Sequence, residues 1–185
     1  MRIKTHWFRR SHERGSAEVG AAAAMMVWRN ALLTVRALSE DGPVTDRPGG
    51  HLRMVEELAV FGLQFADRLA WLRGMPDEER RQLVEAMVAK LADLARENSS
   101  DETVGWDFIG FSAPRLDAYA RTDYEQEQPS FACLNLMARA VCEAGGHERD
   151  TWLHARLVEI DGPELVEKLR RGVGGLFENL QRQPG

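Results

Sequence analysis

The chain has 185 residues, of which 44% are hydrophobic and 29% charged, as in an ordinary soluble globular protein. A chain of this length can bury about 70% of the surface that its unfolded form exposes, so one domain with a sizeable core is expected. The apolar run at residues 21–28 is too short for a membrane span or a secretory signal. Two cysteines are too few for a disulfide framework. We therefore expect a cytoplasmic protein with reduced cysteines and no contact with a membrane.

The net charge of −5 is distributed unevenly along the chain. Residues 1–15 carry five Lys or Arg and one acidic residue, whereas the other 170 residues carry 19 basic and 28 acidic ones. This pattern predicts a basic N-terminal arm, residues 1–15, which either binds an acidic partner or folds back on the acidic body; we favour the second. Because phosphate contacts need a basic face, we expect no nucleic-acid partner.

Long segments with helical periodicity, separated by Pro and Gly, predict an all-α fold. We expect a single-domain bundle of six or seven helices over residues 16–182, with three long helices first and a long C-terminal helix last. Only residues 3–8 alternate weakly, as a strand would. The first helix is predicted from Ser16, as N-cap, to about Ser39, and a loop at 41–50 follows.

The second helix is expected over residues 51–73 and ends at Gly74, and Pro76 opens the third. Acidic residues 77–79 then lie in the first turn of the third helix, where the positive end of the helix dipole stabilises them. One stripe of this helix is predicted to face the core: Leu83, Met87, Leu91 and Leu94.

The second half of the chain has less regular signals. Residues 101–128 fit a short helix through Phe108 and Phe111, with a new start at 112–114. Further helices are expected at about 129–144 and 148–159. The last helix begins at a capping-box pattern, Asp161 to Glu164. Residues predicted to point inward from the helix at 129–144 are Phe131, Leu134, Ala138 and Val141.

The first two helices have apolar residues on more than one face. Val19, Met26 and Leu33 form a second apolar line on the first helix, while Val60 and Trp71 interrupt the polar side of the second. A central helix covered by its own chain explains this, and so does a second subunit. We predict self-association through these residues, most simply as a two-fold dimer.

A concentration of aromatic residues at 106–131 is the first candidate for a ligand site. Such a cluster can line a pocket, but it can also close the open end of a bundle, and we favour the second interpretation. The residues that would line the pocket are Trp106, Phe108, Phe111, Tyr119 and Tyr124, with Phe131 at its end.

His147, Asp150 and His154 have a spacing that would place three metal-ligand side chains on one face of a continuous helix. Gly145 and Gly146 instead place His147 at or outside the helix start, so we predict no bound metal. The basic and glycine-rich stretch 168–175 superficially resembles a phosphate-binding loop. Because such loops follow a strand and open a helix, we interpret these glycines as sites of bending or close packing.

No catalytic residue can be assigned from spacing, and we expect no cofactor. Cys133 has no basic neighbour in sequence and is interpreted as a core residue. Two classes of function remain open. We favour a non-enzymatic interaction or regulatory protein that self-associates as a homodimer. The alternative is a small-molecule- or metal-binding helical bundle, which could be an enzyme, with a site at 106–131 or at His147, Asp150 and His154.

Overall fold

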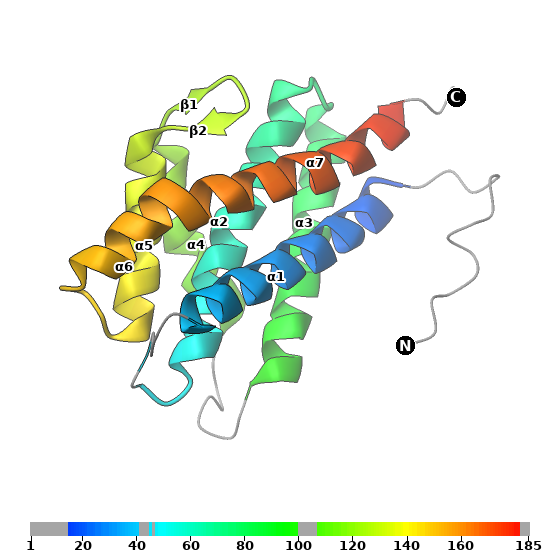
Figure 1. The fold of residues 1–185 in the computed structure, drawn as a ribbon. Coiled ribbons are helices and arrows are strands. Elements are labelled where there is room, and N and C mark those ends of the chain that lie inside the picture. Colours follow the sequence, from blue (N-terminus) through cyan, green and yellow to red (C-terminus); the bar gives the residue numbers. More distant parts are fainter. Residues whose placement is uncertain (1–14, 41–44, 46, 100–106, 182–185) are drawn as a thin grey trace.

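A computed structural model describes residues 15–40, 45, 47–99 and 107–181 of the chain. Trp106 and all of the predicted basic arm except its last residue, Gly15, lie outside these residues. The described part is an all-α bundle with a long C-terminal helix, which confirms the predicted fold class (Figure 1). Its helices are α1 (Ser16–Glu40), α2 (Gly50–Leu72), α3 (Asp77–Asn98), α4 (Phe108–Ala120), α5 (Phe131–Gly145), α6 (Thr151–Arg156) and α7 (Gly162–Gln181).

Helix α2 is the centre of the bundle. It packs against α1, α3, α4, α5 and α7. All residues from Met54 to Leu63 are buried, so this part of the helix is covered on every side. The buried stretch includes the carboxylates of Glu56 and Glu57 as well as Val60. The sequence showed a polar side on this helix, but neighbours from distant parts of the chain cover that side too.

Helices α1 and α7 lie side by side and run in opposite directions across one face of the bundle (Figure 1). Helix α1 also lies along α3, and two glycines allow close approach. A Cβ atom at Gly20 would meet the Leu83 carbonyl of α3, and one at Gly62 of α2 would lie 2.6 Å from Val27 of α1. Close packing of α1 therefore involves both α3 and α2.

The predicted boundary between α2 and α3 is confirmed. Arg73 is the C-cap of α2, Gly74 follows with a left-handed φ of 73°, and Pro76 is the N-cap of α3. On α3, the predicted core residues Leu83, Met87, Leu91 and Leu94 are all buried. At the start of α1, the Gly15 carbonyl accepts hydrogen bonds from the backbone nitrogens of Glu18 and Val19. Gly15, rather than the predicted Ser16, therefore occupies the N-cap position.

The region from 107 to 131 differs from the prediction. Helix α4 is one continuous helix that contains Pro114. The Asp107 side chain caps its start by accepting from the Ile109 nitrogen. A small hairpin of β1 (Tyr124–Glu125) and β2 (Gln128–Pro129) follows, with Tyr124 paired to Pro129. Ser130 then caps α5. The prediction that Phe131 points inward is wrong, because this first residue of α5 lies on the solvent side and is exposed.

The capping box predicted at Asp161 is also wrong. Helix α6 continues through a π-helical turn, η3 (Leu157–Asp161), directly into α7. The Asp161 carboxylate accepts a hydrogen bond from Arg156 Nε at 2.8 Å, so it serves this turn and does not cap a new helix.

Candidate functional site

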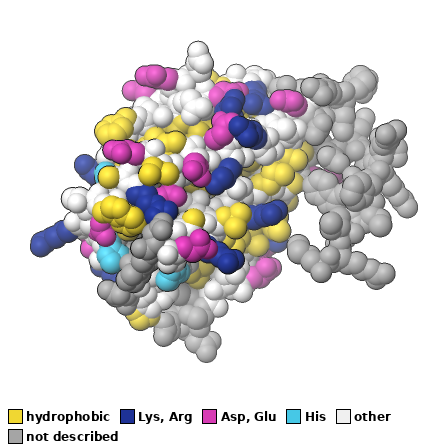
Figure 2. All heavy atoms as spheres, viewed as in Figure 1, with side chains coloured by type: hydrophobic (Ala, Val, Ile, Leu, Met, Phe, Trp, Pro, Cys, Tyr) yellow, Lys and Arg dark blue, Asp and Glu magenta, His cyan; other side chains and the backbone are white. Residues whose placement is uncertain are grey.

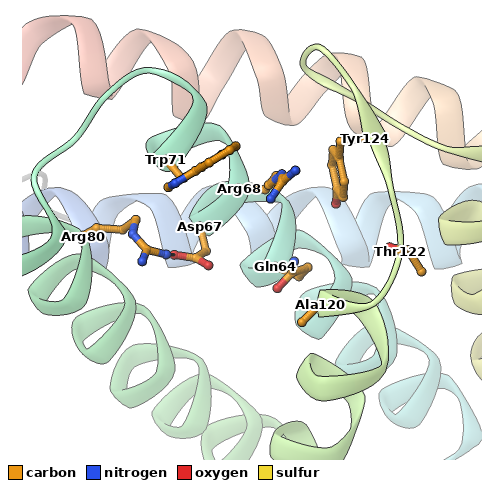
Figure 3. Close-up of a pocket in the computed structure, with 8 residues that line it drawn as sticks. All are labelled: Gln64, Asp67, Arg68, Trp71, Arg80, Ala120, Thr122 and Tyr124. Carbon is orange, nitrogen blue, oxygen red and sulfur yellow. Dashed lines mark hydrogen bonds and ion pairs between the residues drawn. The ribbon is translucent and has the colours of Figure 1, made fainter.

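A surface pocket lies between the C-terminal half of α2 and the segment that joins α4 to the hairpin (Figure 3). Residues 64, 67, 68 and 71 share one face of α2 because they are three or four positions apart. The pocket has a volume of about 260 Å³. It is lined by Gln64, Asp67, Arg68 and Trp71 of α2, Arg80 of α3, Ala120 of α4, and Thr122 and Tyr124.

The guanidinium of Arg68 lies between two aromatic rings. Its central carbon is 4.4 Å from the centroid of the Trp71 ring and 5.5 Å from that of Tyr124 (Figure 3). Stacking of this kind is a cation–π interaction, and it fixes the plane of the guanidinium without using its N–H donors. The rings therefore hold a cation in place while leaving its hydrogen-bonding groups available.

Arg68 has no carboxylate partner among the described residues. Its Nε atom is buried and lacks a hydrogen-bond acceptor in that part of the chain. A buried donor without a partner is costly, and a bound water or a ligand is one way to satisfy it. The guanidinium fork suits a planar acceptor with two oxygens, such as a carboxylate.

The nearest acid on the same helix face, Asp67, is engaged elsewhere. Arg80 Nη1 donates to Asp67 Oδ1 at 2.8 Å, and Arg80 Nη2 lies 3.5 Å from Asp77 Oδ1. Figure 3 shows the Asp67 side chain turned toward Arg80 rather than toward Arg68. This ion pair of α2 and α3 keeps Asp67 from neutralising Arg68.

Tyr124 is positioned by the hairpin and by the core behind it. Its ring centroid lies 6.4 Å from that of Phe65, and its hydroxyl lies 3.8 Å from the Cys133 sulfur. Burial, together with the nearby Cys133, raises the pKa of Tyr124 well above its usual value. The hydroxyl therefore stays protonated, and the ring acts as a packing surface rather than an acid or base.

The structure separates the aromatic residues that were predicted to share a pocket. Tyr124 lines the Arg68 pocket, whereas Phe108 and Tyr119 are buried in the core. The Tyr119 ring packs edge-on against Phe61 at 5.8 Å, and burial raises the pKa of its hydroxyl. Phe111 lines a different hollow. Phe108 and Tyr119 therefore pack within the bundle, whereas Tyr124 and Phe111 line two separate hollows.

The second hollow, of about 270 Å³, opens beside the N-terminal half of α2. Arg115 of α4 lies at its wall, with Nη2 3.0 Å from Glu57 Oε1. Burial raises the pKa of the Glu57 carboxyl, and the hydrogen bond and charge of Arg115 act in the opposite direction. Arg47 at the rim donates to the Glu143 carbonyl and to Glu148, each at 2.9 Å. Since these groups satisfy one another, we interpret this hollow as a structural charge network that joins α2, α4 and α5.

The predicted metal candidates do not form one helical face. His147 lies between α5 and α6, and Asp150 is the N-cap of α6, accepting from the Leu153 nitrogen at 2.9 Å. Within the described ranges, no group of three or more His, Cys, Asp or Glu residues is arranged to hold a metal ion.

The five predicted self-association residues lie in three different environments. Val19 and Val60 are 2% and 0% exposed, so the prediction that they form a contact surface is wrong in the folded chain. The reason is that the buried face of α1 is broad and that α2 is surrounded. Met26 is half-buried against α7, near Gly172. Leu33 and Trp71 are 48% and 50% exposed, and Trp71 lies at the Arg68 pocket.

The glycine-rich stretch of α7 lies in the middle of that helix, so it has no strand before it and opens no helix. Gly174 has a different use. A Cβ atom at this position would lie 2.8 Å from both terminal nitrogens of Arg73, which donates to the Gly174 carbonyl at 2.9 Å. The predicted close packing is therefore present at Gly174.

Sequence reasoning missed Arg68. It noted Trp71 on the polar side of the second helix, and Arg68 three residues earlier was a usable signal, because that spacing places both on one face. The other ring, Tyr124, comes from a hairpin that the sequence did not predict.

Comparisons with protein families, with curated proteins and with solved structures find no match to this chain. No helix in the described ranges is long and apolar enough to cross a membrane. The geometry of the Arg68 pocket is therefore the strongest guide to function.

Proposed function

We propose that this protein is a non-enzymatic interaction protein that binds a carboxylate of a partner protein in the Arg68 pocket. The observation that supports this proposal is the Arg68 guanidinium, stacked between Trp71 and Tyr124 with no carboxylate partner in the described part of the chain. Charge-assisted hydrogen bonds between arginine and carboxylate are among the stronger polar contacts in proteins.

The dimensions of the pocket favour a side chain of a partner protein over a larger free ligand. Pockets that enclose drug-sized molecules usually have volumes of about 300–1,000 Å³, and this one has about 260 Å³. An Asp or Glu side chain fits such a space. Trp71 is half exposed at the rim, and Trp, Tyr and Arg are the residues most enriched at the energetic centres of protein interfaces.

The lining residues also support a binding role rather than catalysis. Burial keeps the Tyr124 hydroxyl protonated, and Asp67 is held by Arg80. The Tyr124 hydroxyl is therefore not placed to act as a base toward a ligand near neutral pH, and the Asp67 carboxylate is engaged by its ion pair.

A cytoplasmic location belongs to the same proposal. Cys133 and Cys142 are free, buried thiols, and free thiols persist in the reducing cytoplasm. Burial raises the pKa of Cys142 to about 11, so this cysteine is a packing residue and not a reactive thiolate.

The test is an NMR titration with a carboxylate probe, the capped tripeptide acetyl-Gly-Glu-Gly-amide. The resonances followed are the Arg68 Nε–H and the Trp71 indole N–H. We expect both to shift with a dissociation constant of about 1–10 mM, as suits a single charged contact. The matched probe acetyl-Gly-Gln-Gly-amide should cause no saturable shift at these sites.

The control variants separate the pocket from general electrostatics. Arg68→Gln should abolish the shift of the Trp71 indole, whereas Arg96→Gln, on the exposed side of α3, should leave it unchanged. If inorganic phosphate bound more tightly than the Glu peptide, the ligand of the pocket would be a phosphate group and not a partner's carboxylate. Unchanged binding of the Glu peptide to Arg68→Gln would show that the peptide does not bind in the Arg68 pocket.

A further inference from the structure

The outward face of α1 carries apolar residues that the bundle leaves uncovered. Met25, Leu32 and Leu33 are 38%, 42% and 48% exposed. Figure 2 views the molecule from the side of α1 and α7, where hydrophobic side chains are interspersed with positive and negative ones. Exposed apolar residues gathered on one helix face are typical of a protein contact surface.

Six residues lie in a line along the centre of this face, from Glu18 to Arg36, and their sequence positions are spaced symmetrically. Steps of four, three, four, three and four positions separate them, so the stripe has the same spacing when it is read from either end, with Val27 at its midpoint. The stripe consists of Glu18, Ala22, Met25, Arg29, Leu32 and Arg36.

A stripe of this kind can pair with itself when two copies of the helix run in opposite directions. Around a two-fold axis at the level of Val27, Glu18 of one copy then faces Arg36 of the other, and each pair occurs twice. In the same register, the small Ala22 faces the large Leu32. The charges are therefore complementary at both ends, and Ala22 and Leu32 are complementary in size. Met25 faces Arg29, whose aliphatic stem can pack on it while the guanidinium stays in water at the edge of the contact.

The two charged residues that pair across the axis, Glu18 and Arg36, are available for this contact. Glu18 and Arg29 form no ion pair with any described residue. Arg36 lies 3.6 Å from Glu40 of the same helix, and the two side chains are 78% and 70% exposed. A pair so exposed contributes little to stability, so exchanging it for a contact with a second copy costs little.

We propose that α1 is a homodimer interface, in which two copies of the chain pair antiparallel through the stripe from Glu18 to Arg36. Leu33 lies beside this line and extends its apolar area. The interface is separate from the Arg68 pocket, because its residues lie on α1 and those of the pocket on α2, α3, the end of α4 and the segment from there into the hairpin. This proposal replaces the contact surface of Val19 and Val60, which the fold buries.

The decisive experiment is a charge exchange measured by sedimentation equilibrium of the full chain. Wild type should show a monomer–dimer equilibrium between about 5 and 500 µM. Glu18→Arg should weaken dimerisation by about tenfold or more, since two attractive pairs become repulsive, and Arg36→Glu should do the same. The double variant Glu18→Arg/Arg36→Glu restores opposite charges, so its dissociation constant should return to within about threefold of wild type.

Two further variants distinguish this interface from loss of folding and from other contacts. Leu32→Asp should give a monomer whose circular dichroism and thermal unfolding match those of wild type, because Leu32 is exposed in the monomer. Trp71→Asp should leave dimerisation unchanged. A wild-type monomer at about 500 µM would overturn the proposal, and so would a double variant no better than its single parents.

Discussion

Arg73 and Glu127 form a two-point ion pair that joins the end of α2 to the turn of the hairpin. Arg73 Nε lies 2.8 Å from Glu127 Oε1, and Nη2 lies 3.2 Å from Oε2. The third nitrogen of Arg73 donates to the Gly174 carbonyl of α7. One guanidinium therefore fixes the hairpin that carries Tyr124 relative to the helix that carries Arg68, so it positions the two sides of the pocket.

The first prediction concerns the pH dependence of this ion pair. The hydrogen bond from Arg73 lowers the pKa of Glu127 below its usual value. A carboxyl whose folded-state pKa is lowered adds stability above its unfolded pKa, and this stability is lost as the pH falls through the folded value. Glu127→Gln should therefore destabilise the protein by about 1–2 kcal/mol at pH 7. The difference from wild type should shrink below pH 4.5.

Urea unfolding of both proteins at pH 7 and at pH 3 measures this effect. Glu125→Gln, on the same hairpin and exposed, is the control and should change stability little at either pH. An equal cost of Glu127→Gln at both pH values would show that charge is not the source of the effect.

The second prediction compares two neighbouring glycines of α7. A Cβ atom at Gly175 would meet nothing within 4 Å, so Gly175→Ala should stabilise the helix by about 0.5–1 kcal/mol. A Cβ atom at Gly174 would displace the guanidinium of Arg73. Gly174→Ala should therefore be less stable than Gly175→Ala by about 1–2 kcal/mol. Thermal unfolding compares the two, and equal gains would mean that Arg73 moves aside freely.

The third prediction tests the core stripe of α3. Leu91 is fully buried, and Leu91→Ala should destabilise the protein by about 2–5 kcal/mol, because it leaves a cavity. Ile160→Ala removes an exposed side chain of η3 and should change stability by less than about 0.5 kcal/mol. Both values come from chemical unfolding, and an unchanged midpoint for Leu91→Ala would place this stripe outside the core.

The fourth prediction concerns the buried carboxylate of Glu57. Arg115→Met removes the partner of Glu57, and we expect a cost of about 2 kcal/mol at pH 7. This is less than for a fully buried pair, because the Arg115 side chain is 36% exposed. The double variant Glu57→Gln/Arg115→Met should recover much of the loss, since no charge then remains buried.

Acidic pH provides an independent check of this interpretation. Burial raises the pKa of Glu57 in the folded protein. The Glu57 carboxyl therefore stabilises the fold most at low pH, and this stabilisation is lost as the pH rises from the pKa of the unfolded state through that of the folded state. Without Arg115, the carboxyl gains a proton more readily still. The cost of Arg115→Met should therefore decrease toward pH 4.5, and a cost that grows there would contradict our account of the network.

The sequence determined those parts of the fold that depend on near neighbours in the chain. Gly74 and Pro76 set the boundary between α2 and α3 through their own backbone preferences. The periodicity of α3 identified Leu83 to Leu94 as core, because a helix with one apolar stripe has only one face to bury. These signals act within a few residues, so they can be read without knowledge of the tertiary structure.

The tertiary structure alone decided which surfaces are covered and which side chains meet. Val60 lies on the polar side of α2 in the sequence pattern but is buried, because α2 is surrounded by its two sequence neighbours, α1 and α3, and by three later helices, α4, α5 and α7. Arg68 and Tyr124 are far apart in the chain, and they meet because the packing of Tyr124 on Phe65 and the Arg73–Glu127 ion pair hold the hairpin against α2. Burial and side-chain contact depend on the packing of separate elements, which periodicity and capping patterns within one element do not encode.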